Sequence, residues 1–404
     1  MILKGGKIIL NNCLINKDLL IKNDIIEKID DNINIDGEEI IDVKDMLVMP
    51  GGVDVHVHFR EPGYTYKETI KSGSEAAAKG GFTTVMTMPN LSPVPDSIEN
   101  LKIEQDIIDR DACIHIYPYI ASTKGQKGLE KADIISLKDK TYAISDDGMP
   151  VNNLDVLKQV MEDAKKCDLI VCSHAETLAI DKNDPKSESE AVKNEIGLAK
   201  EIGCRYHFCH LSTKESYDLI RKARQEGYKN ISCEVSPHHL TLCKDYMLVK
   251  DANFKMNPPL RSKEDMEATI EALVDGTADV VATDHAPHAP YEKKRTYEMA
   301  PNGIIGIETA FPIIYTKFVK TNIISLDRFL DVMCYNPIKI FKLPERKLEV
   351  GYKADICVLD ITHEKEYKED EIKSLSINSP FIGNKYYGFN TLTIVDGKIV
   401  YKRG

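Results

Sequence analysis

The sequence predicts an α/β protein in which a (β/α)8 barrel carries a small β-sandwich formed by both termini. The middle of the chain alternates apolar, β-rich runs with helical stretches, as parallel strands joined by crossover helices do. Both ends are instead rich in short strands and turns. The 404 residues are enough for one barrel and one small unit. We expect the sandwich in residues 1–50 and 344–404, and the barrel in residues 51–343.

Eight apolar, β-rich runs are the expected barrel strands. They are residues 53–58, 82–88, 112–120, 141–145, 168–175, 204–212, 231–240 and 278–287. The helical stretches between them include residues 68–79, 154–165, 214–225 and 263–274, whereas the crossover at 124–136 is the weakest. An open, doubly wound sheet is the alternative, but no G-x-G-x-x-G turn occurs.

The two ends of the chain show β-like patterning, punctuated by turn signals such as Asn11-Asn12 and Asp396-Gly397. The β-like stretches are residues 3–10, 18–29, 354–360 and 392–400. Because two β-rich ends flank a different middle, we expect them to pair into one small sandwich.

Composition excludes several classes of protein. The net charge of −11, with no basic block, argues against nucleic acid or an anionic membrane as partner. No apolar run reaches the roughly 18 residues of a membrane helix, and the first residues do not resemble a signal peptide. The ten cysteines include no C-x-x-C pair. They are typical of buried thiols in a reducing compartment, and we expect a cytoplasmic protein.

Histidines gather where the predicted strands end. Eight of the 11 lie at or just past a strand's carboxyl end: His56, His58, His174, His210, His238, His239, His285 and His288. In a barrel these ends share one mouth, where active sites lie. Histidines far apart in the sequence are therefore expected to meet in space.

A metal site follows from five of these strand-end residues. The side chains of His56 and His58 point to the same side because a strand repeats every two residues. His174 and His210 supply a second pair from neighbouring strands, and Asp284 ends the strand beside the first. Alone, each is more often a core histidine or a helix cap. Together, nitrogen and oxygen donors at four strand ends favour a hydrolytic zinc site.

Longer motifs extend this pattern. They are Asp54–Gly63 (DVHVHFREPG), Ala282–His288 (ATDHAPH), and between them MPN at 88–90, SDDG at 145–148, HAE at 174–176, CHLSTKES at 209–216, PHHL at 237–240 and NPPLR at 257–261. With these motifs in this order, the chain resembles the amidohydrolase superfamily and, within it, the dihydroorotase family. The resemblance covers residues 1–404.

The resemblance implies a fold, a reaction and a cofactor. The family fold is a metal-dependent TIM barrel with a sandwich built from both termini. The family reaction is the zinc-dependent, reversible cyclisation of N-carbamoyl-L-aspartate to L-dihydroorotate in the synthesis of UMP. By resemblance His56, His58 and Asp284 hold one Zn²⁺, and His174 and His210 hold a second. Asp284 also acts as the general acid and base.

The resemblance also implies the substrate contacts. Arg60 and Asn90 would bind the substrate carboxylate, for which the planar fork of an arginine is well suited. Asn257, His288 and the backbone of Asn302 and Gly303 would contact the ring.

The ligand that bridges the two metals stays open at this level. Some members of the superfamily use a carboxylated lysine on the fourth strand, and others use an aspartate in a motif similar to SDDGMP at 145–150. Asp147 fits the second kind, although it could be a turn residue before Gly148. Lys140 starts the same strand, and its long stem with a carbamate could reach the mouth, although it could also be an exposed lysine.

Residues 286–303 form a long polar loop after the eighth strand. A loop at a barrel mouth can act as a lid that excludes water during the reaction, and we expect that role here rather than a mobile surface loop.

Two other functions compete with the one implied. A hydantoinase or allantoinase would share the metal ligands, but Arg60 beside Asn90 suits a ring with a free carboxylate. A metal-free, non-catalytic relative would have lost ligands, whereas all five non-bridging positions here hold ligand-type residues. Expected partners are the small-molecule substrate, further copies of the chain, and an assembly with aspartate transcarbamoylase.

Overall fold

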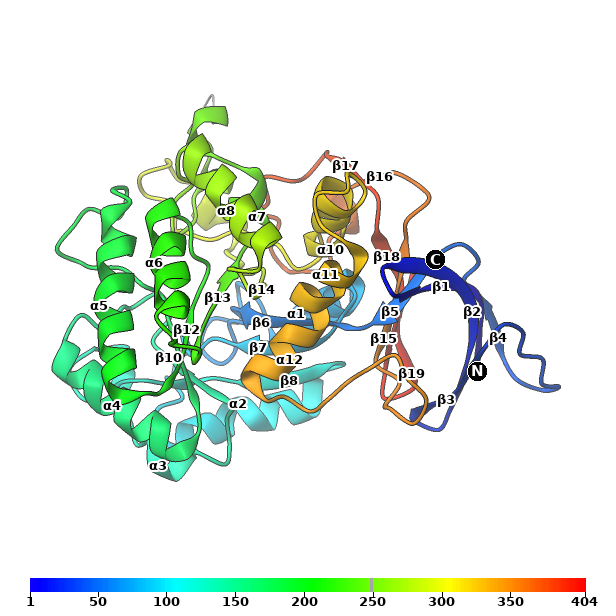
Figure 1. Ribbon diagram of the computed structural model, residues 1–404, viewed down its shortest axis with the longest axis horizontal. Helices are drawn as coiled ribbons and strands as arrows, with labels where there is room; N and C mark the ends of the chain where they lie inside the picture. The colour runs from blue at the N-terminus through cyan, green and yellow to red at the C-terminus, as the bar shows by residue number, and fades with distance from the viewer. Residues whose placement is uncertain (248–249) are drawn as a thin grey trace.

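The computed structural model describes residues 1–247 and 250–404, and it consists of a barrel with a curved β-sheet beside it (Figure 1). This arrangement confirms the fold class predicted from the sequence. The barrel comes from the middle of the chain, and the sheet takes strands from both ends.

The barrel strands are parallel neighbours in chain order. They are β6 (Gly52–Val57), β7 (Phe82–Thr87), β8 (His115–Pro118) continued by β9 (Ile120–Ala121), β10 (Ala143–Ser145), β11 (Ile170–Ser173), β12 (Arg205–Phe208), β13 (Ile231–Val235) and β14 (Val280–Val281). The amide of His58 donates to the carbonyl of His285 at 2.8 Å and closes the ring between β6 and the end of β14. All eight strands therefore direct their carboxyl ends to one mouth.

Helices pack outside these strands. The longer ones are α1 (Ile70–Gly80), α2 (Ile98–Asp111), α4 (Leu154–Cys167), α5 (Lys186–Ile202), α6 (Lys214–Gln225) and α8 (Lys263–Asp275). The shorter ones are α3 (Ile134–Leu137), α7 (Pro237–Thr241), α9 (Pro290–Lys293), α10 (Ala310–Ile314), α11 (Leu326–Leu330) and α12 (Asn336–Phe341), with the π-helical turns η4 (Tyr315–Val319) and η5 (Asp331–Tyr335). The weak crossover at 124–136 forms only the short turn η1 (Lys124–Gln126) and α3.

Local sequence explains how the first crossover helix begins and ends. At the N-terminus of α1, the Thr69 side chain accepts a hydrogen bond from the Ser72 amide, which satisfies an otherwise unpaired donor. At the other end Gly81 has a φ of 93°, and its amide donates to the last carbonyls of the helix. β7 starts at the next residue. This sharp end of α1 lets the chain return directly to the barrel as β7.

Both termini form one eight-stranded sheet. Its strands are β1 (Ile2–Leu10), β2 (Cys13–Lys22), β3 (Ile25–Asp30), β4 (Ile40–Asp42), β5 (Leu47–Pro50), β15 (Ile356–Asp360), β18 (Phe389–Val395) and β19 (Lys398–Lys402). The β-like stretch at 18–29 is a hairpin, because Asn23 has a φ of 56° and turns the chain between β2 and β3. The two ends join where β5 pairs antiparallel with β15.

The curved sheet has its own core and a firm contact with the barrel. Leu3, Val48 and Ile356 lie in a hydrophobic cluster that is separate from the barrel core. On β18, the Thr393 hydroxyl donates to the Ala78 carbonyl of α1 at 2.6 Å. The sheet therefore adds a second donor to a helix-end carbonyl that also accepts from the Gly81 amide.

The segment between β15 and β18 leaves the sheet. It contains the small hairpin β16 (Lys365–Glu366) and β17 (Lys385–Tyr386), and its Tyr367 and Phe381 share a hydrophobic cluster with Met256 and Ile304 of the barrel. Sequence reasoning put all of 344–404 in the sandwich, whereas this stretch lies against the barrel mouth.

The helices and the cysteines can be compared with what the composition predicts. Within residues 1–247 and 250–404, none of the helices combines the length and the apolar character needed to cross a membrane. Seven of the ten cysteines are buried, and all ten are unpaired thiols.

Candidate metal centre and active site

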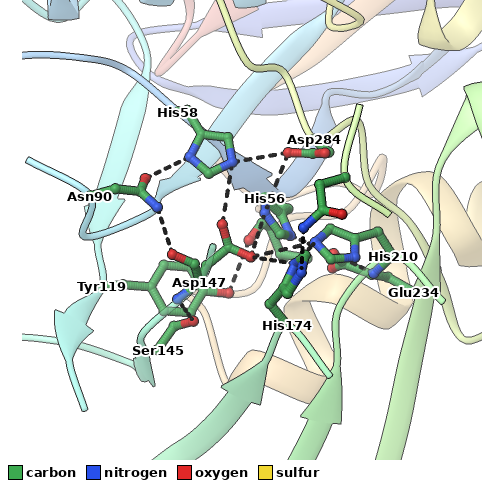
Figure 2. A network of polar contacts seen from close by, with 12 residues as sticks. His56, His58, Asn90, Tyr119, Ser145, Asp147, His174, His210, Glu234 and Asp284 are labelled. Carbon is green, nitrogen blue, oxygen red and sulfur yellow. Dashed lines mark hydrogen bonds and ion pairs between the residues drawn. The ribbon is translucent and has the colours of Figure 1, made fainter. Parts of the chain in front are cut away.

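Six side chains converge at the carboxyl ends of five barrel strands (Figure 2). They are His56 in β6 and His58 just after it, Asp147 after β10, His174 after β11, His210 after β12 and Asp284 after β14. All six are buried. The structure thus brings together the five non-bridging ligands predicted from the sequence.

Asp147 lies at the centre of the cluster. Its Oδ1 atom is 3.4 Å from His56 Nε2 and 3.4 Å from His210 Nε2. The same oxygen is 3.8 Å from His174 Nδ1, and the other oxygen, Oδ2, is 3.5 Å from His58 Nε2. One carboxylate therefore faces both histidine pairs at once.

Asp284 closes the other side of the first pair. Its Oδ1 atom is 2.9 Å from His58 Nε2 and 3.6 Å from His56 Nε2. Asp284 has a φ of 48° and His210 a φ of 29°, in the left-handed region that residues with a side chain rarely adopt. Such strain is typical of functional positions that the surrounding fold holds in place.

The outward ring nitrogens are held by three other side chains. His56 Nδ1 is 2.6 Å from Glu234 Oε1, and His58 Nδ1 is 2.6 Å from Asn90 Oδ1. His174 Nε2 is 3.1 Å from Glu176 Oε2. Each partner can accept a hydrogen bond from the outer nitrogen, so that the inner nitrogen of each ring faces the cluster.

Sequence reasoning missed Glu234 and Glu176. Glu234 was detectable as the one acidic residue within the apolar run 231–240, and Glu176 as part of the HAE motif. Both are strongly ionised: His56 and His207 hold the pKa of Glu234 at about 2 against the effect of burial. The hydrogen bond from His174 holds the pKa of Glu176 at about 2.

Opposite charges also stabilise the ionised form of Asp147. Burial alone would raise its pKa, but the charges of His56 and His58 hold the pKa well below its ordinary value. Burial by itself would lower the pKa of His56, and the charges of Asp147 and Glu234 raise it well above the usual range. The cluster therefore combines carboxylate anions with imidazole rings, which are donor types of a divalent-metal site.

The cluster fits a divalent metal pair. His56, His58 and Asp147 offer donor atoms within 4.8 Å of one another, and so do Asp147, His174 and His210. A tetrahedral zinc ion with bonds of about 2.0–2.1 Å separates its donors by roughly 3.3 Å, close to the distances found here. His56 Nε2 and Asp147 Oδ1 are buried and make no hydrogen bond to any described residue. Such atoms are the ones that a cation would satisfy.

The structure does not bring Lys140 to this cluster. Lys140 precedes β10 at the opposite end of the barrel, is exposed, and lines a surface cavity of about 320 Å³ with residues of α2. Asp147 follows the same strand and lies in the cluster. The position of Lys140 therefore favours Asp147 as the bridging residue, because Lys140 lies exposed before β10, seven residues ahead of Asp147.

Arg60 lies beside the cluster with a guanidinium group that is not paired with an acid. Its Nε atom donates to the Pro287 carbonyl at 3.4 Å, and no carboxylate of residues 1–247 or 250–404 lies within ion-pair distance. Burial lowers its pKa, while the charges of Asp284 and Asp147 act in the opposite direction. A half-buried guanidinium without an acidic partner is suited to an anionic ligand.

The other predicted substrate contacts lie around the same mouth. The Asn90 amide donates to the Asp147 carbonyl at 2.7 Å, and the Asn257 amide is 2.9 Å from His174 Nε2. Burial lowers the pKa of His288 to about 2, so its ring is neutral. His288 Nε2 donates to the Asn302 carbonyl at 2.7 Å.

Position 303 has no room for a side chain, which explains the glycine there. Its φ is 131°, and a Cβ atom there would lie 2.8 Å from the Cβ of Ala286 and 3.0 Å from His288 Nε2. Its amide donates to the Lys255 carbonyl at 2.9 Å, so the backbone groups of Gly303 are used within the protein. In the structure, Gly303 allows the backbone to pack closely against His288.

Comparison with known proteins agrees with this site. The model of the amidohydrolase family matches residues 47–400. A dihydroorotase of Fusobacterium nucleatum is 43% identical over 99% of this chain and 98% of its own length. A dihydroorotase of Macrococcus caseolyticus is 42% identical over 100% and 99%.

Solved structures give the same fold. The L-hydantoinase of Arthrobacter aurescens superimposes with a TM-score of 0.90 at 26% identity, over 100% of this chain and 96% of that one. A dihydropyrimidinase of Brevibacillus agri gives 0.87 at 22% identity, over 99% and 95%. From the matched family model and the full-length relatives, this chain belongs to the amidohydrolase family and, within it, to the dihydroorotase group.

Proposed function

We propose that this protein is a dihydroorotase that interconverts N-carbamoyl-L-aspartate and L-dihydroorotate in the cytoplasmic synthesis of UMP. The full-length relatives of that name support the reaction, at 43% and 42% identity. Hydantoinases share the fold at lower identity, 26% for the L-hydantoinase. The observation that carries the choice of substrate is the position of Arg60, which offers an unpaired cation beside the metal cluster.

The proposed cofactor is a pair of Zn²⁺ ions. His56, His58 and Asp284 would hold one, His174 and His210 the other, with Asp147 shared between them. Bound zinc supplies a Lewis acid for the amide carbonyl and brings the pKa of water to about 7. The protein's own contribution is to hold the donor atoms with their lone pairs inward, which Glu234, Asn90 and Glu176 support.

Asp284 is the proposed proton carrier. In the ring-opening direction a water oxygen adds to the ring carbonyl, and Asp284 accepts the proton that this water loses. When the carbon–nitrogen bond breaks, Asp284 returns the proton to the departing ring nitrogen, so atoms and charge balance. The neighbouring His58, His56 and His210 hold the pKa of Asp284 below its ordinary value, which keeps it ready to accept.

Arg60 is the proposed ligand of the ring carboxylate. Two parallel N–H groups of a guanidinium match the two oxygens of a carboxylate, and the half-buried site strengthens the attraction. A hydantoin ring without a carboxylate would leave this cation unpaired, which costs binding energy. The arrangement therefore favours dihydroorotate over neutral cyclic amides.

A panel of substrates tests this proposal. The purified protein is assayed for ring opening of dihydroorotate, hydantoin and allantoin, with and without a zinc chelator. We expect turnover of dihydroorotate that the chelator abolishes and that zinc restores. Faster turnover of hydantoin or allantoin would assign one of those reactions instead. A folded protein that binds no stoichiometric zinc and turns over none of the three would be a non-catalytic relative.

The substitution Arg60→Gln tests the recognition of the carboxylate. Losing a charged partner for a buried anion costs about 2–5 kcal/mol, so kcat/KM for dihydroorotate should fall on the order of 10²-fold. The control is Arg295→Gln, which removes an exposed arginine of the 286–303 loop and should leave kcat/KM unchanged. An equal loss in both variants would contradict the role of Arg60.

The proposed partners are further copies of the chain and aspartate transcarbamoylase, whose product is the substrate of this reaction. The lid function of residues 286–303 likewise stays a prediction. Measuring the mass of the purified protein by light scattering, with and without that transferase, tests both proposed partners.

A further inference from the structure

Lys293 is a buried lysine at the mouth of the barrel. It is the last residue of α9, and only 8% of it is exposed. Its Nζ atom donates to three backbone carbonyls: Gly303 at 2.9 Å, Pro301 at 3.1 Å and Lys255 at 3.4 Å. No carboxylate of residues 1–247 or 250–404 forms an ion pair with it. Because burying an ammonium group is costly, three aligned carbonyls have to balance its charge.

The three carbonyls belong to two segments that approach the proposed substrate pocket. Pro301 and Gly303 flank Asn302, whose carbonyl accepts the hydrogen bond from His288. Lys255 lies two residues before Asn257, and its carbonyl also accepts from the Gly303 amide at 2.9 Å. A single ammonium group therefore joins the two loops that carry Asn257 and Asn302.

Asn378 holds the same loop from the other side. Its amide donates to the carbonyls of Ala286 and Gly303, at 3.1 Å and 3.0 Å, and its Oδ1 atom accepts from the His288 amide at 3.3 Å. The Gly303 carbonyl thus receives donors from both Asn378 and Lys293. With Asn378 fixing the His288 side, the distance to the Asn257 side depends on Lys293 together with two direct bonds, from the Gly303 amide to the Lys255 carbonyl and from the Lys255 ammonium group to the Ala300 carbonyl at 2.7 Å.

We infer that Lys293 is a positioning residue for substrate binding, which sets the spacing between the Asn257 loop and the His288–Asn302 loop. The inference rests on the proposed function. Lys293 contacts neither the metal-ligand cluster nor Arg60, so its effect reaches the substrate only through these loops. An ammonium group has three donors, and here each of them meets one carbonyl. Removing the charge frees the loops and weakens substrate binding, while the reacting groups stay intact.

Geometry and charge make this device sensitive to pH. Burial and the charge of Lys255 lower the pKa of Lys293 to about 8, against the opposing charge of Asp251. Above pH 8 the amine loses one of its three donors. An arginine at this position would keep its charge up to much higher pH.

The test compares three variants. Lys293→Met removes the charge at similar length, Lys293→Arg keeps it, and Lys294→Met is a matched control at the exposed neighbour. We expect Lys293→Met to raise the KM for dihydroorotate at least about tenfold with kcat changed less than about threefold. Lys294→Met should match the wild type. Between pH 7 and pH 9 the KM of Lys293→Arg should stay constant, whereas the KM of the wild type should rise relative to it.

Hydrogen exchange separates this inference from the proposed function. In the protein without substrate, Lys293→Met should speed amide exchange at residues 252–257 and 300–305, whereas Lys294→Met should not. This result shows that Lys293 holds the two loops together even when dihydroorotate is not turned over, so a failure of the proposed function and a failure of the loop contact give different outcomes. The inference is overturned if Lys293→Met leaves both the KM and the amide exchange unchanged. It is also overturned if Lys293→Met lowers kcat and the melting temperature together and Lys293→Arg restores neither. If Lys293→Met does not fold, a wild-type KM whose pH dependence equals that of Lys293→Arg also overturns it.

Discussion

Each histidine of the metal centre has two ring nitrogens with different tasks. In His56 the outer nitrogen is 2.6 Å from Glu234, while the inner one faces Asp147 and Asp284. Glu234 also lies 3.1 Å from His207, so one buried carboxylate is tied to two imidazoles. At this scale function depends on partners that fix the tautomer, because only an unprotonated inner nitrogen can bind a metal.

Asp284→Asn should abolish turnover. An amide has the size of a carboxyl group but cannot accept and return a proton, and loss of a general acid and base typically costs about 10²–10⁴-fold in rate. We expect kcat to fall by at least about 10² while the circular dichroism spectrum stays that of the wild type. The zinc content of the variant is measured in parallel. A kcat near the wild-type value would exclude Asp284 as the proton carrier.

Asp147→Ala and Lys140→Ala should differ sharply in zinc content and in activity. Asp147 faces all four histidines, so its removal should lower the zinc content and abolish activity. Lys140 is exposed, and its removal should leave both within about twofold. Metal analysis and a turnover assay measure the two effects. Loss of activity in Lys140→Ala that a short carboxylic acid restores would instead favour a carboxylated lysine.

At the scale of the element, the short strands matter most for what lies at their ends. β10 has three residues and β14 two, and a residue of the cluster lies two positions after β10 and three positions after β14. The crossover helices hold these strands from outside through buried side chains, some of them polar. On α2, Glu104 accepts a hydrogen bond from the Thr87 hydroxyl at the end of β7, at 2.7 Å. Its other carboxyl oxygen is buried and makes no hydrogen bond to a described residue.

Glu104 should make stability fall as the pH rises. Burial raises its pKa to about 8, so the folded protein holds a proton there that the unfolded chain releases near pH 4.5. This contribution is complete below about pH 4.5 and is lost as the pH rises through about 8. Glu104→Gln removes the titration. Urea unfolding should find the variant similar to the wild type at pH 5 and more stable by a few kcal/mol at pH 9.

The matched control for this prediction is Glu99→Gln, an exposed acid on the same helix. Its free energy of unfolding should follow that of the wild type across this pH range. If Glu104→Gln loses stability with pH as steeply as the wild type does, the buried carboxyl is not the titrating group.

At the scale of the whole molecule, the curved sheet stabilises the barrel that it accompanies. β18 packs against α1, where Thr393 and Asn390 donate to the Ala78 carbonyl. Barrel and sheet are also joined by Asp355, which lies 3.0 Å from His115 of β8. The segment after β15 carries Asn378 to the barrel mouth. The terminal unit therefore contributes both stability and part of the substrate pocket's support.

Thr393→Val should destabilise the protein by about 1–3 kcal/mol. The substitution keeps the shape of the side chain but leaves the buried Ala78 carbonyl with one donor fewer. The free energy of unfolding in urea measures this. Thr296→Val, at an exposed position, should change it by less than about 0.5 kcal/mol. Equal effects in the two variants would mean that the contact between sheet and helix adds nothing.

Much of this architecture could be predicted because it follows from local periodicity. The alternation of strand and helix predicts a barrel, and strand ends place His56, His58, His174, His210 and Asp284 at its mouth. Contacts that do not follow from the strand ends could not be predicted. His56 and Glu234 are 178 residues apart, and no spacing rule joins them. The same holds for Lys293, whose acceptors lie in two different loops.

The sequence by itself determined the class of the barrel, the donor types of the metal centre and the family. A period of two directs His56 and His58 to the same side whatever surrounds them. Only the tertiary structure decided between Asp147 and Lys140 as the residue that reaches the cluster. The two lie seven positions apart around one strand, and the strand's direction places one at the mouth and the other at the opposite end. Strand ends become neighbours only when the barrel closes, so the physical reason is closure itself.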